Sequence, residues 1–175
     1  MESDNDTIAR MFVAAVRGAV EQEQRRLSHS LRQLSDEAVW TKPSPQVNCV
    51  GNIVLHLLGN LRQWFLHGLG GEPNVRNRPA EFENVPPIPK QQLQNDLDEL
   101  FARIGTLLDG VTADTLVQRR RIQGWNKSLL EAIYSTVNHL EGHSLQVAYI
   151  THLLVGEAYE PFWRPQSVEE GAPKP

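Results

Sequence analysis

The stretch SLLEAIYSTVNHLEGHSLQVAYITHLLV, residues 128–155, decides the fold class of this chain. Its apolar residues recur at intervals of four and seven, the spacing that places side chains on one face of an α-helix. This apolar stripe consists of Leu129, Ile133, Leu140, Val147 and Leu154. Gly156 follows directly, and glycine is the commonest residue just beyond a helix C-terminus. The pattern predicts one long amphipathic helix over about residues 126–155.

Three further stretches have the same helical period. They predict long helices over residues 7–34, 50–69 and 91–108. Asn48 is a candidate N-cap for the second of these helices, and Gly70 with its neighbouring glycine ends it. Little of the remaining sequence has the alternating pattern of a strand. The chain is therefore predicted to be mainly α-helical.

The connections between the predicted helices differ greatly in length. Residues 72–90 contain five prolines, which predicts a long extended crossover between the second and third helices. Residues 117–124 are typical of either a short strand or an extended arm. Four long helices with one crossover favour an all-α four-helix bundle with non-sequential packing. We expect residues 1–160 to form this single domain and residues 161–175 to form a proline-rich C-terminal tail.

Composition and charge exclude several classes of protein. The chain has 175 residues, 40% of them hydrophobic and 22% charged, which is typical of one globular domain. No apolar run approaches the roughly 20 residues of a membrane helix, and the acidic first residues do not resemble a secretory signal. A net charge of −4 argues against a nucleic-acid surface, and the single cysteine, Cys49, excludes an internal disulfide. We expect a soluble, cytoplasmic globular domain.

Two histidines in the last predicted helix are the first candidates for chemistry. His139 and His143 are four residues apart, so they lie on one helix face about one turn apart and near the apolar stripe. This spacing lets two imidazoles bind one metal ion. Leu140 stands where a zincin motif has glutamate, and Glu141 lies on the opposite side of the helix. Histidines beside an apolar face are more often structural, so the pair alone leaves both roles open.

The second predicted helix offers a third histidine, His56. It lies off the apolar stripe, in a row of polar side chains with Asn52, Asn60, Gln63 and His67. Such a row is most often the solvated face of a helix, but a buried row would suit a metal site. Three histidines from two facing helices would leave coordination positions open for water or substrate.

Other residues offer weaker signals. Cys49 is more typical of a small buried side chain than of a ligand, and His29, His67 and His152 have no partner at ligand spacing. Residues 119–121, three consecutive arginines, favour a solvated arm, with an anion contact as the alternative. The four tryptophans, Trp40, Trp64, Trp125 and Trp163, are expected to pack loops onto the bundle. No phosphate-binding glycine loop, dinucleotide fingerprint or nucleophile elbow is present.

The order of these features resembles that of a known superfamily. Residues 52–57, Asn-Ile-Val-Leu-His-Leu, resemble the second-helix signature of the DinB/YfiT-like superfamily. Residues 141–146, Glu-Gly-His-Ser-Leu-Gln, resemble its fourth-helix stretch, with Leu145 in place of the usual glycine. Residues 71–78, with Glu81 and Phe82, are similar to a DinB-like branch of mostly uncharacterised proteins. The likeness spans about residues 7–155.

The resemblance implies a four-helix bundle that holds a divalent metal ion, often nickel or zinc. Its metal ligands would be His56, His139 and His143. Relatives in this superfamily include thiol-dependent transferases, and many are homodimers. The resemblance therefore implies a homodimeric metalloenzyme, with a low-molecular-weight thiol as a candidate cofactor.

Two functional classes stay open at this point. The first is a metal-dependent transferase or hydrolase acting on a small molecule. The second is a non-catalytic, stress-associated helical bundle in which the metal serves stability. The sequence has no obvious general base beside the histidines, but a metal-bound thiolate needs none. Asn60 and Gln146 are candidates to orient a bound water or substrate, and Arg76 and Arg78 to contact an anionic group.

Overall fold

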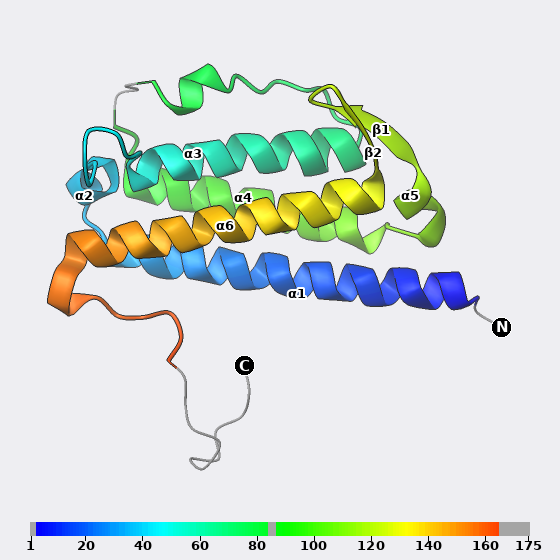
Figure 1. Cartoon of the computed structure of the whole chain (residues 1–175), viewed down its shortest axis with the longest axis horizontal. Helices are drawn as coiled ribbons and strands as arrows, with labels where there is room; N and C mark the ends of the chain where they lie inside the picture. The colour runs from blue at the N-terminus through cyan, green and yellow to red at the C-terminus, as the bar shows by residue number, and fades with distance from the viewer. Residues whose placement is uncertain (1–2, 84–86, 165–175) are drawn as a thin grey trace, which may run out of the picture.

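The fold is described from a computed structural model, which describes residues 3–83 and 87–164. Its long helical segments are α1 (Asp4–Gln33), α3 (Val50–Leu61) with its π-helical continuation η1 (Arg62–Leu69), α4 (Lys90–Asp109) and α6 (Leu129–Val155). They lie side by side as a four-helix bundle (Figure 1). The prediction of an all-α four-helix bundle is confirmed.

The direction of each helix explains the long crossover. Figure 1 shows α1 and α6 running one way and α3 and α4 running the other. α1 packs against α6 and α4, while α3 packs against α4 and α6, so α1 and α3 lie diagonally. Since α3 and α4 are parallel, the chain must return along the whole bundle between them. The described residues of this return, 70–83 and 87–89, lie over the outer side of α3 (Figure 1).

The core consists of the predicted apolar stripes. Leu57 and Leu61 of α3, Leu97 of α4 and Leu140 of α6 have no exposed surface. Burial of each such side chain stabilises the fold by roughly 1.5–3 kcal/mol. This packing holds together helices whose stability in isolation would be marginal. Ile8, an apolar residue of the first predicted helix, lies outside this core, because it is 63% exposed near the start of α1.

A β-hairpin replaces the predicted first residues of the last helix. Strand β1 (Arg119–Ile122) pairs with β2 (Trp125–Ser128) in antiparallel register, and α6 begins at Leu129 rather than near 126. The turn residues Gln123 and Gly124 both have positive φ, at 52° and 82°. This is the backbone that a two-residue hairpin turn requires, and glycine adopts it without strain. Of the two alternatives for residues 117–124, the strand is correct.

Short helices not predicted from the sequence complete the fold. They are α2 (Asp36–Trp40), α5 (Ala113–Val117) and the 3₁₀ segments η2 (Pro79–Glu81) and η3 (Gly156–Ala158). The predicted cap of α3 is wrong by one residue, since Cys49 is the N-cap and its side chain makes no capping hydrogen bond.

The chain after α6 turns back onto α1. The backbone N–H of Glu160 donates to the Gln33 side chain at 2.7 Å, and the Phe162 ring meets the His29 ring edge-on. Most of the predicted tail, residues 165–175, lies outside the described residues. Within the described part of the chain, no helix is both long enough and apolar enough to cross a membrane.

Candidate metal centre

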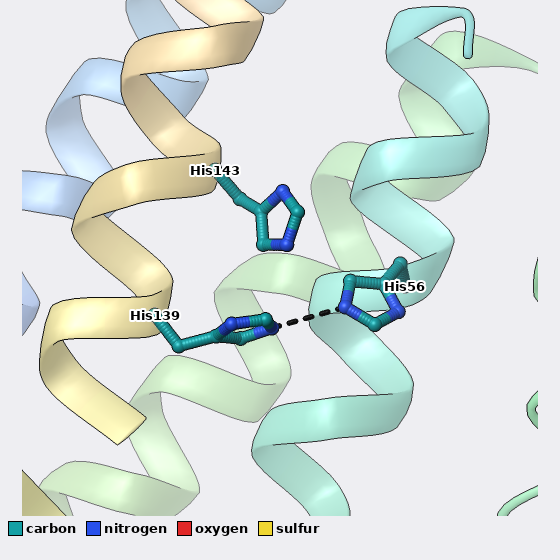
Figure 2. Close-up of side chains that lie close together, drawn as sticks. All are labelled: His56, His139 and His143. Atoms are coloured by element: carbon teal, nitrogen blue, oxygen red, sulfur yellow. Dashed lines mark hydrogen bonds between the residues drawn. The ribbon is translucent and has the colours of Figure 1, made fainter. Parts of the chain in front are cut away.

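Three histidines meet in the interface between α3 and α6. His56 projects from α3, and His139 and His143 project from consecutive turns of α6 toward it (Figure 2). The Nε2 atoms of His56 and His139 are 3.0 Å apart, and one ring nitrogen from each of the three lies within 4.8 Å of the others. The structure therefore brings together all three residues that the sequence suggested as ligands.

The row of polar residues on α3 and η1 is buried, except for the half-buried His67 at its end. Asn52, His56, Asn60 and Gln63 are each less than a tenth exposed. The cause is the crossover, which covers this face: the Asn52 side chain donates to the backbone carbonyl of Glu81 at 3.0 Å. Of the two alternatives for this row, the polar pocket is correct and the solvated face is wrong.

Glu81 is the residue of the site that the sequence did not reveal. Its Oε2 atom lies 2.8 Å from Nδ1 of His56, and its side chain is 7% exposed. Arg76 donates to both carboxylate oxygens, from Nε at 2.6 Å and from Nη2 at 2.9 Å. The sequence offered no general base near the histidines because Glu81 lies in an irregular segment, where no periodicity indicates which helix it meets.

Hydrogen bonds fix the orientation of two imidazole rings. An ion-paired carboxylate only accepts, so the Nδ1–H of His56 donates to Glu81 and its Nε2 presents a lone pair toward His139. Nδ1 of His143 lies 2.7 Å from Oε1 of Gln146, which accepts in the same way. Gln146, which the sequence suggested for orienting a bound water or substrate, thus orients the His143 ring. Nε2 is the nitrogen left for a metal ion in both rings.

Burial favours the neutral form of His56 and His139. Desolvation lowers the pKa of His56, although the hydrogen bond and charge of Glu81 oppose this shift. The pKa of His139 is lowered to about 4, chiefly by burial and then by the neighbouring His143, His56 and Arg76. Metal coordination needs neutral imidazole, so this environment prepares the nitrogens for it at pH 7.

A pocket of about 520 Å³ opens beside the three rings. Besides the histidines, its lining includes Asn60, Arg76, Arg78, Phe82 and Gln123. Arg76 is committed to Glu81 and to Oε1 of Gln63, 2.9 Å away. The Arg78 guanidinium lies 5.4 Å from the Phe82 ring centroid on an exposed stretch of the crossover. Of the two arginines suggested for anion binding, Arg78 is the more available.

The other candidate residues lie outside this cluster. Cys49 is buried, and its thiol donates to Oδ1 of Asn52 at 2.9 Å, in agreement with a structural role. His29 and His67 bond to backbone carbonyls, and His152 stacks on Tyr159 at 4.4 Å. The arginines at 119–121 are exposed on β1.

The four tryptophans divide into two groups. Trp40 donates its indole N–H to the carbonyl of Ile88 at 3.0 Å, and so holds the end of the crossover on the bundle as predicted. Trp64 lies beneath the amino group of Lys127 in β2, at 5.6 Å from the ring centroid. Trp125 and Trp163 are 65% and 57% exposed, so the expectation that every tryptophan packs a loop is wrong for these two.

The donor set fits a borderline divalent cation. Neutral imidazole nitrogens suit zinc, nickel and copper, whereas magnesium and calcium require oxygen ligands. At metal–nitrogen distances of about 2.1 Å, two ligands of one ion lie roughly 3.0–3.4 Å apart. The 3.0 Å between His56 and His139 agrees with this range. The third ligand nitrogen, from His143, lies within 4.8 Å of the other two, so the three histidines could hold a metal ion if the rings draw together around it.

A family model described as a protein of unknown function, DUF1572, matches residues 7–168. The chain belongs to the DUF1572 family. This match covers both metal-candidate helices and the crossover, so these elements are part of the DUF1572 fold. No curated protein matches the chain.

Solved structures with the same fold include two bacterial proteins. A conserved protein from Enterococcus faecalis superposes with a TM-score of 0.68 at 17% identity, over 82% of this chain and 97% of that one. A DinB-like protein from Bacillus cereus ATCC 10987 gives 0.62 at 16% identity, over 81% and 89% of the two chains. These structures show that the chain has the fold of a DinB-like protein, in agreement with the fold that the sequence resemblance implied.

Proposed function

We propose that this DUF1572 protein is a metal-dependent enzyme of the DinB-like type. His56, His139 and His143 would hold one divalent ion, nickel or zinc. The observation that carries the proposal is the convergence of these three imidazoles at the edge of a pocket. Catalytic zinc sites typically have three protein ligands and an open position, whereas structural zinc sites are closed by a fourth.

The surroundings of the histidines support an open position. Among the described residues, the group that can hold a metal consists of these three histidines alone. The nearby carboxylate of Glu81 is occupied by His56 and Arg76. A bound ion would act as a Lewis acid, lowering the pKa of a bound thiol or water. Substrate would fill the remaining coordination sphere from the pocket side.

We propose a thiol-dependent transferase or a hydrolase acting on a small molecule. A volume of about 520 Å³ suits a small ligand. The buried thiol of Cys49 is committed to Asn52, so the attacking sulfur of a transferase would come from a low-molecular-weight thiol. Arg78 would attract its anionic groups, and Phe82 would contact its apolar part. Such thiols are reduced in the cytoplasm, where we place this reaction.

Metal content tests the first part of the proposal. The His139→Ala variant should retain far less nickel or zinc than the wild-type protein, because it loses one of three ligands. The matched control is His152→Ala in the same helix, whose ring stacks on Tyr159 away from the site. Metal per chain is measured after loading and gel filtration. Equal retention by both variants would refute the ligand assignment.

Turnover tests the second part. The metal-loaded protein is incubated with small thiols plus electrophilic substrates, and separately with simple esters and amides. We expect activity that the His56→Ala variant lacks. If no reaction exceeds that control and no thiol binds by calorimetry, the protein is a non-catalytic metal-binding bundle instead.

We also propose a homodimer. Leu145, Tyr149 and Leu153 recur every four residues on α6 and are each about half exposed or more, which gives this helix an apolar outer stripe. Apolar stripes of this kind are typical of helix–helix interfaces. Light scattering after gel filtration should give a dimer for the wild-type protein and a monomer for Tyr149→Glu. A wild-type monomer would contradict this.

A further inference from the structure

The crossover places one carboxylate against the metal-candidate histidines. Glu81 is the last residue of the short 3₁₀ segment η2. Its Oε2 atom lies 2.8 Å from Nδ1 of His56, the ring nitrogen that does not point toward His139. Nothing in the local sequence requires this contact, because Glu81 and His56 are 25 residues apart. The contact depends on how the crossover lies on α3.

Several independent contacts hold Glu81 in this position. The guanidinium of Arg76 donates to both carboxylate oxygens of Glu81, and the side chain of Gln63 in η1 accepts from the same guanidinium at 2.9 Å. The backbone carbonyl of Glu81 accepts from Asn52 at 3.0 Å. Asn52, His56 and Gln63 all belong to the buried polar row. The crossover is thus hydrogen-bonded to a residue before His56 in the sequence, Asn52, and to one after it, Gln63.

Gly59 gives this carboxylate its space. A Cβ atom at position 59 would overlap Oε1 of Glu81 and lie 3.2 Å from Nε of Arg76. Because Arg76 and His56 hold the carboxylate on both sides, it has little freedom to move away. Alanine at this position, one turn after His56, would favour the helix but would force the carboxylate to shift.

We infer that Glu81 is a positioning residue of the metal centre, a role that rests on the proposed metal site. By accepting the Nδ1–H of His56, it keeps the Nε2 lone pair directed at the position shared with His139 and His143. Its negative charge also makes that imidazole a stronger ligand. Arg76 stabilises the buried carboxylate that does this.

His56 and His143 differ in the strength of this support. The partner of His143 is the neutral amide of Gln146, whose residue is exposed. The partner of His56 is a buried carboxylate held by an arginine. Charge-assisted hydrogen bonds are about twice as strong as neutral ones. Because of Glu81, the ring of His56 is held more rigidly than the ring of His143.

Two variants remove this support without touching a histidine. Glu81→Gln keeps the size of the side chain and removes its charge, and Gly59→Ala keeps the carboxylate and displaces it. Gly18→Ala in α1 is the control, because a Cβ there meets nothing within 4 Å. Zinc and nickel affinities are measured by competition with a coloured chelator. We expect both variants to bind about 10- to 100-fold more weakly and the control to bind like wild type.

The tautomer of His56 separates positioning from a purely structural role. Imidazole ¹⁵N shifts of the metal-free protein at neutral pH should show the proton on Nδ1 in wild type and in Gly18→Ala. In Glu81→Gln and Gly59→Ala it should move toward Nε2. Weaker metal binding with an unchanged tautomer, or unchanged binding and tautomer, would overturn the inference.

The same measurement distinguishes the two proposals. If the wild-type protein binds neither zinc nor nickel, the proposed function fails, and the tautomer in metal-free protein still decides the role of Glu81. Gly59→Ala serves where Glu81→Gln does not fold, since it preserves every polar group of the site.

Discussion

At the scale of single residues, burial changes what histidine does. The usual pKa of histidine lies close to 6.5, so an exposed ring is partly charged in mildly acidic solution. Within the α3–α6 interface, desolvation favours the neutral ring, and His56 and His139 both have lowered pKa values. The same burial that prepares these rings for a metal makes the metal-free protein sensitive to acid.

We predict that the metal-free protein loses stability as the pH falls from about 6.5 toward 4. The pKa of His139 is about 4 in the folded chain and near 6.5 when unfolded, so the unfolded chain binds more protons in this window. Protons therefore favour unfolding there. Urea unfolding in the presence of a chelator, repeated across this range, measures the slope of the unfolding free energy against pH.

The variant His139→Gln should have a shallower slope than wild type, because it cannot take up that proton. His152→Gln, at an exposed histidine of the same helix, should keep the wild-type slope. Identical slopes in wild type and His139→Gln would show that burial of this ring does not govern the acid response.

At the scale of one element, α6 begins where its cap allows. Ser128 accepts a hydrogen bond from the backbone of Glu131 at 3.2 Å, and Glu131 accepts one from the backbone of Ser128 at 2.8 Å. The pKa of Glu131 is lowered because its carboxylate accepts from the backbone N–H of Ser128 and also from the Ser128 hydroxyl, each at 2.8 Å. The helical period of the sequence predicted that this helix begins near residue 126. The period does not indicate where strand hydrogen bonds end and helical ones begin.

We predict that Ser128→Ala lowers the unfolding free energy by about 1 kcal/mol, which is typical of a lost N-cap. The loss should be measurable by urea unfolding, because the hairpin and the first turn of α6 are joined at this residue. Ser3→Ala removes the cap of α1, whose first residues are all exposed, and should cost less. A larger loss at Ser3 would contradict this account of the capping box.

At the scale of the whole molecule, a buried charge cluster joins α1 to α6. Glu23 of α1 is 2% exposed, pairs with Arg26 and accepts a hydrogen bond from the Ser144 hydroxyl of α6. Arg26 lies over the Phe162 ring at 5.5 Å, so the returning C-terminal segment covers the cluster. Parallel packing of the first and last helices brings these residues together, and Ser144 is the direct neighbour of His143.

We predict that Arg26→Met destabilises the protein by about 3 kcal/mol, because it leaves the Glu23 carboxylate buried without its cation. Arg25→Met, at the exposed neighbouring position, is the control and should change stability by less than about 0.5 kcal/mol. Thermal and urea unfolding measure both variants. Equal stability of the two would show that the cluster is dispensable.

The sequence by itself determined the four long helices and the shared face of His139 and His143. Both follow from the geometry of one helix, in which bonds between residues four apart fix every spacing. The polar row on the second helix made His56 a candidate, and the likeness to a superfamily then grouped it with them as a ligand. The contact of Glu81 with His56, the pairing of Arg76 with Glu81 and the burial of Glu23 came from the tertiary structure alone. An irregular crossover has no period, and a charged residue on a helix does not reveal which neighbouring helix will bury it.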